Sequence, residues 1–382
     1  MRVLMLNWRD IRNPAAGGAE VATHELMRRW VAWGHQCTLF SASFPGAPAE
    51  ERADGVRIVR QGGPYTVRLL AWRRYLSDPR LQADVVIDQC HGLPFWTPLY
   101  VRGPKVAYIH EVAGEIWRLM TPFPLSRIGP HLEAWSLRLY RDIPFITVSP
   151  STRDDLEAHG LRHVRVIPNG LSCPVPTQMP EKETDLTVLF VGRLIKMKGI
   201  EDALDAFARV AAAVPTARLW VVGSGHPRYE ASLRGRTRAL GIEGKVTFWG
   251  RLAEEEKLRL MGRAHVLIHP SVKEGWGLVV LEANAQGTPA VGYAVAGLRD
   301  SIRHGETGFL TPPRQPVALA EAIVALWRDP ARREAMGRAA RAWASTFRWD
   351  DSARAWCEVL EQAMEQGRPG HTFASSVDVR PS

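Results

Sequence analysis

Two glutamates in the second half of the chain lie on either side of the start of a predicted helix. They belong to residues 273–291, which read KEGWGLVVLEANAQGTPAV. The two glycines of the EGWG segment disfavour helix, whereas the pattern from Leu278 onward is helical until Gly-Thr-Pro stops it. We therefore expect Glu274 on a loop and Glu282 a little more than one turn into the helix.

The start of this helix is a predicted anion site. The first-turn amides near Gly277, Leu278 and Val279 have no acceptor within the helix and lie at the positive end of its dipole, which attracts phosphate. Glu282 is then placed to accept hydrogen bonds from a diol such as a ribose, and Glu274 from sugar hydroxyls one group further along. The alternative is that both glutamates only favour the helix start through its dipole.

Two cations follow another predicted strand in residues 187–199, TVLFVGRLIKMKG. The strand ends at Gly192, and Arg193 and Lys198 follow on the turn before the next helix. At this end of a strand the two side chains suit a diphosphate, because arginine offers a planar fork and lysine a mobile point charge. The alternative is ordinary solvated surface charge.

The first half of the chain has two comparable features. Gly17 and Gly18 lie between the first strand and a predicted helix, where adjacent glycines let a ligand approach the backbone closely. His110 directly follows the predicted strand 105–109, so its side chain is expected at the sheet edge where ligands bind. A plain loop and a structural histidine are the respective alternatives.

The predicted strands and helices of the chain indicate which sheets would position these residues. Strands alternate with helices almost throughout the chain. Helical patterns such as 19–33 and 199–214 separate short, apolar, β-branched runs. This alternation predicts an α/β protein with parallel sheets covered by helices on both faces. The predicted strands are 2–7, 36–40, 56–59, 84–88, 105–109, 144–148, 164–167, 186–191, 218–222, 245–248, 265–268 and 289–293.

The chain of 382 residues is too long for one comfortable core, so we predict two domains. The expected fold is two Rossmann-like, doubly wound parallel-sheet domains that face each other across a cleft. Four prolines and little periodicity mark residues 168–185 as the boundary between the domains. The expected parts are an N-terminal domain (1–170), a linker (171–185), a C-terminal domain (186–345), a C-terminal helix packing back toward the N-terminal domain (346–366) and a disordered tail (367–382).

Composition narrows the classes of function. The formal net charge of +9 suits phosphorylated ligands or anionic lipid, and without zinc-finger spacing or a long Lys/Arg run we expect no nucleic acid. No DxD spacing occurs, so we expect no bound metal. Four scattered cysteines, no signal-peptide pattern and no membrane-spanning apolar run predict a cytoplasmic protein.

Two stretches of the N-terminal half, 64–75 and 116–141, are both basic and aromatic. Arginines beside Trp, Tyr and Leu suit peripheral contact with an anionic membrane on its inner face. The alternative is amphipathic helices that pack on the sheet and expose their arginines. The loop 89–97 follows a strand, and Trp96 within it offers a face on which a sugar can stack.

The chain resembles the retaining glycosyltransferase family 4, which is glycogen-synthase-like and has the GT-B fold. The resemblance covers about residues 1–365, and the order and spacing of its motifs carry it. Trp276 stands where Phe is commoner in the family, and Glu111 where Asp is common. The matching motifs are GGAE at 17–20, IHE at 109–111, VSPSTRDDL at 148–156, IPNG at 167–170, GRLIKMKG at 192–199, VVGSG at 221–225, the Glu274/Glu282 pair, GTP at 287–289 and TGFL at 307–310.

The resemblance implies a nucleotide-diphosphate sugar as co-substrate, held mainly by the C-terminal domain, and no separate cofactor. In such enzymes the second glutamate of the pair holds the ribose and the first contacts the donor sugar. Arginine and lysine of the GR…KG stretch neutralise the diphosphate, and the N-domain histidine lies near the reacting sugar. By resemblance, Gly17 and Gly18 close on the phosphates, and the backbone of Leu252 contacts the base.

The resemblance further implies transfer of a hexose with retention of anomeric configuration. The N-terminal domain is the expected acceptor side, and the acceptor is a small molecule, a glycan or a lipid-linked molecule. A nucleotide-sugar epimerase-like enzyme and a catalytically silent homologue acting as a partner protein are the alternatives. A silent homologue should have lost one of the cations or glutamates, and all four are present.

Overall fold

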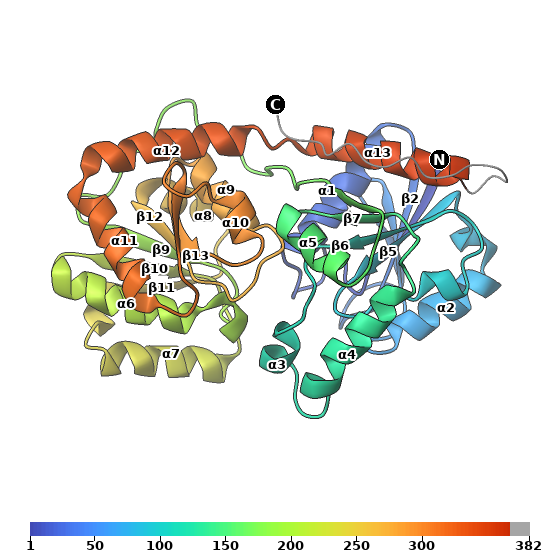
Figure 1. The fold of residues 1–382 in the computed structure, drawn as a ribbon, viewed down its shortest axis with the longest axis horizontal. Helices are drawn as coiled ribbons and strands as arrows, with labels where there is room; N and C mark the ends of the chain where they lie inside the picture. The colour runs from blue at the N-terminus through green and yellow to red at the C-terminus, as the bar shows by residue number, and fades with distance from the viewer. Residues whose placement is uncertain (367–382) are drawn as a thin grey trace. The chain divides into compact units, whose positions relative to one another are not determined.

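A computed structural model describes residues 1–366 of the chain (Figure 1). Within them the chain forms two compact units, residues 1–170 with 348–366 and residues 171–347. The predicted disordered tail, 367–382, lies outside the described residues. Residues 171–185 contain no helix or strand and belong to the second unit.

Unit 1 contains an eight-stranded sheet in the order β3-β4-β2-β1-β5-β6-β7-β8, and every neighbouring pair is parallel except β3 with β4. Its strands are β1 (Arg2–Leu6), β2 (Gln36–Ser41), β3 (Glu50–Ala53), β4 (Val56–Arg60), β5 (Val85–Cys90), β6 (Lys105–Ile109), β7 (Phe145–Thr147) and β8 (Val164–Val166). Its helices are α1 (Gly18–Ala32), α2 (Val67–Ser77), α3 (Ile116–Met120), α4 (Leu125–Arg138), α5 (Pro150–Ala158) and α13 (Trp349–Gln366).

Unit 2 contains a six-stranded, fully parallel sheet in the order β11-β10-β9-β12-β13-β14. Its strands are β9 (Thr187–Val191), β10 (Arg218–Val222), β11 (Val246–Gly250), β12 (Val266–His269), β13 (Ala290–Tyr293) and β14 (Gly308–Thr311). Its helices are α6 (Ile200–Ala213), α7 (Pro227–Ala239), α8 (Glu254–Arg263), α9 (Leu278–Ala285), α10 (Leu298–Ser301), α11 (Pro316–Arg328) and α12 (Pro330–Ser345).

Strand β9 shows why this sequence gives a sheet covered on both faces. Val188 and Phe190 pack into one apolar cluster with helices α6 and α11. Leu189 and Val191, which point the opposite way because side chains alternate along a strand, pack into a second cluster with α8 and α9. A strand buried on both faces therefore reads as a continuous apolar run. The expectation of two parallel-sheet α/β domains is confirmed.

All twelve predicted strands are present, with ends shifted by a few residues, and two strands were not predicted. Strand β3 has the sequence EERA and pairs antiparallel with β4 at the sheet edge. Its charged residues give no apolar signal, and an edge strand does not need one. The expectation of exclusively parallel strands is wrong at this pair. Strand β14, whose GFLT sequence overlaps the TGFL motif in three residues, is too short to stand out.

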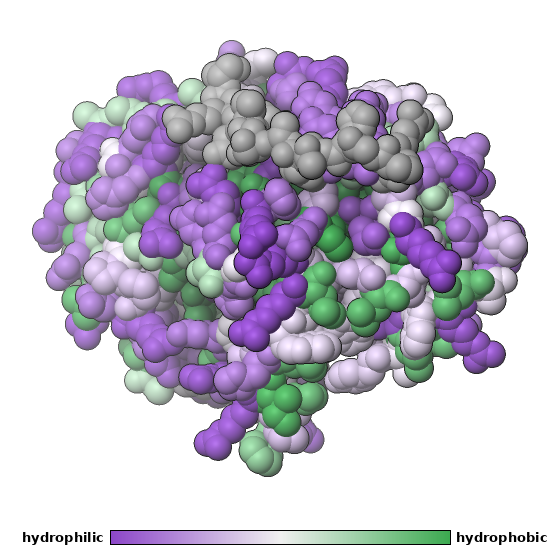
Figure 2. Space-filling model, turned by 45° about the vertical axis from the view of Figure 1, so that its right-hand side comes forward, coloured by the Kyte–Doolittle hydropathy of each residue, from purple (hydrophilic) through white to green (hydrophobic). Residues whose placement is uncertain are grey.

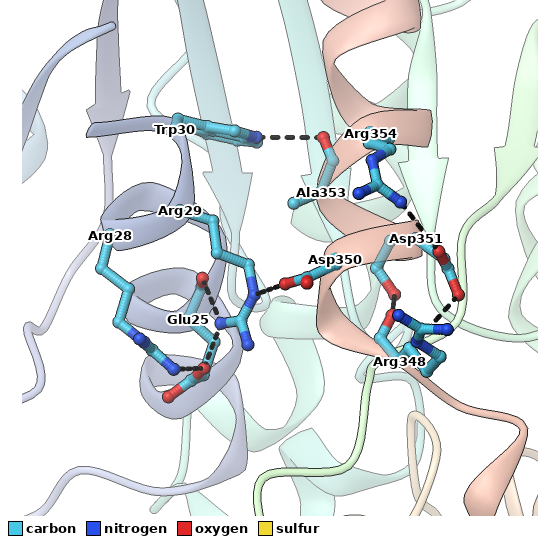
Figure 3. A network of polar contacts seen from close by, with 10 residues as sticks. Glu25, Arg28, Arg29, Trp30, Arg348, Asp350, Asp351, Ala353 and Arg354 are labelled. Atoms are coloured by element: carbon cyan, nitrogen blue, oxygen red, sulfur yellow. Dashed lines mark hydrogen bonds and ion pairs between the residues drawn. The ribbon is translucent and has the colours of Figure 1, made fainter. Parts of the chain in front are cut away.

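Helix α13 belongs to unit 1, where it packs on α1 (Figure 3). The Arg29 guanidinium donates to Asp350 Oδ1 at 2.6 Å, and the Trp30 indole donates to the Ala353 carbonyl at 3.1 Å. Beneath these polar contacts, the rings of Trp30 and Trp356 lie 5.9 Å apart. Residues distant in sequence therefore complete the core of this unit.

Candidate functional site

The sheet of unit 2 has a topological switch point between β9 and β12. These strands are neighbours, but the chain continues from β9 toward β10 on one side and from β12 toward β13 on the other. The loops after two such strands diverge and leave a crevice at their carboxyl ends, where ligands of open parallel sheets bind. Arg193 and Lys198 follow β9, and Glu274 follows β12.

The two loops touch through their backbones. Gly199 has a left-handed φ of 68°, and a Cβ atom at this position would lie 2.0 Å from the carbonyl oxygen of Pro270. The Val272 amide donates to the Met197 carbonyl at 2.9 Å. Glycine is therefore required at 199, because no side chain fits between the loops.

This approach brings Lys198 and Glu274 into contact. The Lys198 ammonium lies 2.5 Å from Glu274 Oε1, and the same oxygen accepts from Ser271 Oγ at 2.8 Å and lies 2.9 Å from His269 Nε2. Burial opposes ionisation of Glu274, but the Lys198 charge and the hydrogen bond from His269 outweigh it and hold the pKa of this carboxyl well below its usual range. Glu274 is thus a buried carboxylate.

The sequence did not point to His269 or Ser271. His269 is the last residue of β12, and both side chains are buried. The available signal was the HPS segment at a strand's carboxyl end, three to five residues before the loop glutamate. Such residues face the same crevice as the loop that follows them.

Helix α9 begins where the sequence predicted. Gly277 caps it with a left-handed φ of 87°, and Leu278 is its first residue. Within residues 1–366 no group accepts a hydrogen bond from the amides of Leu278 and Val279. These amides and the helix dipole form an end that can receive an anion.

Glu282 lies on α9 and pairs with a lysine that the sequence did not indicate. Lys257 Nζ on α8 is 2.8 Å from Glu282 Oε2 and 2.8 Å from Glu254 Oε1. Burial raises the pKa of Glu282, and the Lys257 charge offsets part of this effect. Leu252 lies in the segment between β11 and α8, half-buried against the apolar cluster on the same face of the sheet.

Arg193 differs from Lys198, although both lie on one loop. Its side chain is exposed, and in the part of the chain that the structure describes it forms no ion pair. Lys198 already neutralises a carboxylate, whereas the Arg193 guanidinium has all its donors available for a ligand.

Unit 1 holds the remaining predicted residues. Gly17 is the N-cap of α1, and its amide donates to Glu20 Oε2 at 2.7 Å, so the N3 glutamate satisfies the N-cap amide. Gly18 is the exposed first residue of the helix. The structure places Gly17 and Gly18 after β1 and His110 after β6, in a different unit from the two cations and two glutamates.

His110 is a neutral imidazole. Burial lowers its pKa to about 3. Gln89 Nε2 lies 3.2 Å from His110 Nε2, and Gln89 Oε1 accepts from Thr23 at 2.7 Å. Since an amide nitrogen only donates, His110 Nε2 is the acceptor and Nδ1 carries the proton.

The His110 environment predicts a pH dependence of stability. Below the ordinary pKa of 6.5, the unfolded chain protonates this histidine while the folded chain does not until about 3, so stability falls as pH decreases through this window. The slope contributed by one group is at most about 1.4 kcal/mol per pH unit. His110→Gln should flatten this decline between about pH 5 and 6.5 in urea unfolding, where carboxylates contribute little.

The control is His131→Gln, because His131 is exposed on α4. This variant should follow the wild-type pH profile. An unchanged profile in His110→Gln would contradict a neutral, partly buried histidine.

Neither a metal-ligand cluster nor a membrane span occurs in the described chain. Among residues 1–366 no group of three or more His, Cys, Asp or Glu side chains is arranged to hold a metal ion. The same residues include no helix with the length and apolarity that crossing a bilayer requires.

Family models match both halves of the chain. The model for glycosyl transferases group 1 matches residues 176–343, and the model for Glycosyltransferase Family 4 matches residues 16–173. A glycogen synthase of Mycobacterium tuberculosis is 28% identical over 395 aligned residues, which cover 94% of each chain.

Solved structures share the fold over nearly the whole chain. Sucrose-phosphate synthase from Thermosynechococcus elongatus matches with a TM-score of 0.80 at 22% identity, covering 96% of this chain and 99% of that one. HepE of Anabaena in complex with UDP-glucose matches with a TM-score of 0.73 at 19% identity, covering 95% and 100%.

The switch-point site and these matches define a nucleotide-sugar-dependent glycosyltransferase with the GT-B fold. The two models together cover most of the chain, which is a glycosyltransferase of the family 4 type, as its sequence motifs predicted.

Proposed function

We propose that the chain transfers a hexose from a nucleotide-diphosphate sugar to an acceptor hydroxyl, with retention of anomeric configuration and without a divalent metal. The observation that carries this proposal is the convergence of Arg193, Lys198, Glu274 and the free amides of α9 at the β9/β12 switch point. Two cations and a helix start can stabilise a diphosphate leaving group without a metal ion.

Lys198 would change partners when the donor binds. In the ligand-free chain its ammonium contacts Glu274 Oε1. A diphosphate carries more negative charge than one carboxylate, so the lysine is drawn toward the phosphate, and His269 and Ser271 keep Glu274 in place for the donor sugar's hydroxyls. Glu282 would bind the ribose, and the backbone of Leu252 would contact the base.

The surroundings of Glu274 bear on how configuration would be retained. With Lys198 drawn to the phosphates, Glu274 Oε1 still accepts hydrogen bonds from His269 and Ser271, which leaves it a poor nucleophile toward the anomeric carbon. We therefore favour attack of the acceptor on the same face as the leaving group. The bond between the anomeric carbon and the phosphate oxygen breaks with its electron pair going to the phosphate, the acceptor oxygen bonds to that carbon, and its proton passes to the phosphate oxygen.

Unit 1 would supply the acceptor side. Gly17 and Gly18 would close on the donor phosphates, and His110 would contact the reacting sugar as a neutral imidazole. Trp96, whose indole donates to Ser136 Oγ at 3.0 Å, would offer its ring to a sugar or an acceptor. Cytoplasmic localisation remains a sequence-based prediction, consistent with free thiols at all four cysteines.

A thermal-shift screen tests the proposed donor site. UDP, GDP, ADP, TDP and their common sugars would be added with and without EDTA, with UDP-glucose first because HepE is similar in fold and binds it. One nucleotide should stabilise the protein equally in both conditions. A shift that EDTA abolishes would contradict metal independence. No shift with any nucleotide would favour the catalytically silent homologue, and conversion of the donor sugar without an acceptor would favour the epimerase-like alternative.

Glu282→Ala should weaken donor binding while the fold remains intact. Hydrogen bonds to a charged group contribute about 1.5–3 kcal/mol, so the dissociation constant from calorimetry should rise roughly 10- to 100-fold. The matched control is Glu254→Ala, because Glu254 contacts the same lysine but is exposed on the first turn of α8. Equal affinities in the two variants would refute the ribose assignment.

A further inference from the structure

The α3–α4 segment of unit 1 carries a concentration of exposed apolar side chains. Phe123, between the two helices, is 76% exposed. Figure 2 shows hydrophobic side chains gathered at the lower tip of the molecule, where Figure 1 places α3 and α4. We call this the α3–α4 surface, and its apolar members are Leu119, Met120, Phe123, Leu125, Ile128 and Trp135.

The segment is rigidly attached through other residues. Trp117 lies against the α4 backbone, because a Cβ atom on Gly129 would lie 2.3 Å from its indole. Its indole nitrogen donates to Glu133 Oε2 at 3.0 Å, and that carboxylate also accepts from the Ala113 amide at 2.8 Å. The exposed apolar residues are therefore not needed to hold α3 to α4.

The apolar residues of α4 form one stripe. Leu125, Ile128 and Trp135 recur at helical spacing; Ile128 and Trp135 lie away from the buried positions Gly129 and Glu133, and Leu125 lies at the edge of the stripe nearest to them. A soluble helix places its apolar stripe against a core. Helix α4 has a second apolar stripe, and this stripe is exposed to solvent.

Basic residues border the stripe. Arg127 and Arg138 lie about a quarter-turn from it on α4, and Arg118 precedes the apolar residues of α3. Within residues 1–366 none of these three arginines pairs with a carboxylate. Glu133 is the one acidic residue between 116 and 141, and it is buried. Between residues 116 and 141 the exposed charge is therefore positive, and the nearest exposed acidic residues in the chain, Glu115 and Asp142, lie at the two ends of this range.

Helix α2 contacts the same loop as α4 and also exposes apolar side chains. The Arg68 guanidinium donates to the Leu93 carbonyl at 2.8 Å, so α2 and α4 contact the same loop, α4 through Trp96. Leu69 and Leu76 on α2 are 61% and 62% exposed.

We infer that the α3–α4 surface docks on the surface of a bilayer rich in anionic phospholipid. An interfacial helix needs apolar side chains that enter the acyl boundary and cations beside them at the level of the headgroups, and this segment provides both. A second copy of the chain is a poorer occupant, because a symmetric contact would place arginines against arginines. The inference is independent of sugar transfer and can be tested without a donor.

Co-sedimentation with lipid vesicles tests the inference on the full chain. The wild type should bind vesicles of phosphatidylcholine mixed with phosphatidylglycerol, bind pure phosphatidylcholine far less, and detach in high salt. Arg118→Gln/Arg127→Gln should lower the partition coefficient about fivefold per arginine. Leu119→Ser/Phe123→Ser/Ile128→Ser should lower it roughly tenfold or more.

The matched control is Trp249→Ser/Val317→Ser, which removes exposed apolar residues from unit 2. It should bind vesicles like the wild type, and all variants should keep the wild-type unfolding midpoint, because the substituted side chains are exposed. Equal binding to neutral and anionic vesicles, wild-type binding by the apolar variant, or a dimer in solution that this variant abolishes would each overturn the inference.

Discussion

Lys198→Ala is expected to lower kcat/KM by about 10²–10³, because removing one group that stabilises charge in a transition state has that effect in other enzymes. The bond that breaks leaves negative charge on a phosphate, and the structure keeps this lysine at the switch point, 2.5 Å from the carboxylate assigned to the donor sugar. Steady-state kinetics with the donor identified by thermal shift would measure the effect. A rate near that of the wild type would mean that Lys198 only forms a structural ion pair with Glu274.

Arg193→Ala should lower the rate to a similar degree but leave stability unchanged. Arg193 is exposed and makes no ion pair in the described part of the chain, whereas Lys198 neutralises a buried carboxylate. Removing Lys198 should therefore also reduce the free energy of unfolding by about 1.5–3 kcal/mol. The double variant Lys198→Ala/Glu274→Gln should regain much of this stability without regaining activity, because a neutral amide needs no counter-charge. Recovery of both would mean that the lysine acts only on the fold.

The sequence predicted strands well because unit 2 buries both faces of its sheet. In β9, Val188 and Phe190 pack into one apolar cluster. Leu189 and Val191 pack into the other, so these four consecutive positions are all apolar. The same reasoning fails for β3, whose EERA sequence lies at an edge where no second face is covered. Positions at the carboxyl ends of strands were predictable, since parallel strands bring those ends to one edge.

Partners within the site were not predictable. Lys198 and Glu274 are 76 residues apart in the chain, and only the adjacency of β9 and β12 makes them a pair. Both residues were predicted as ligand contacts, but neither the spacing nor the residue types indicated that they contact each other. The pairing of Lys257 with Glu282 depends in the same way on how α8 packs beside α9.

Gly199→Ala should damage both the fold and the donor site. Alanine at a left-handed φ of 68° costs about 1–3 kcal/mol, and the clash of its Cβ with the Pro270 carbonyl adds a further cost of about 1–3 kcal/mol. Relief of that clash moves the loop that carries Lys198 away from the loop that carries Glu274. Urea unfolding should therefore show a loss of unfolding free energy larger than backbone strain alone would cause. Donor affinity measured by calorimetry should fall as well.

The chain contains a matched control for this variant. Gly241, at the end of α7, has the same φ of 68°, but nothing lies within 4 Å of the position a Cβ would take. Gly241→Ala thus introduces the backbone strain without the clash. Its free energy of unfolding should fall only by the cost of that strain, and its donor affinity should stay at the wild-type value. The difference between the two alanine variants measures the contact between the loops. If both lose equal stability and both bind donor normally, the close approach of Gly199 to Pro270 does not position Lys198.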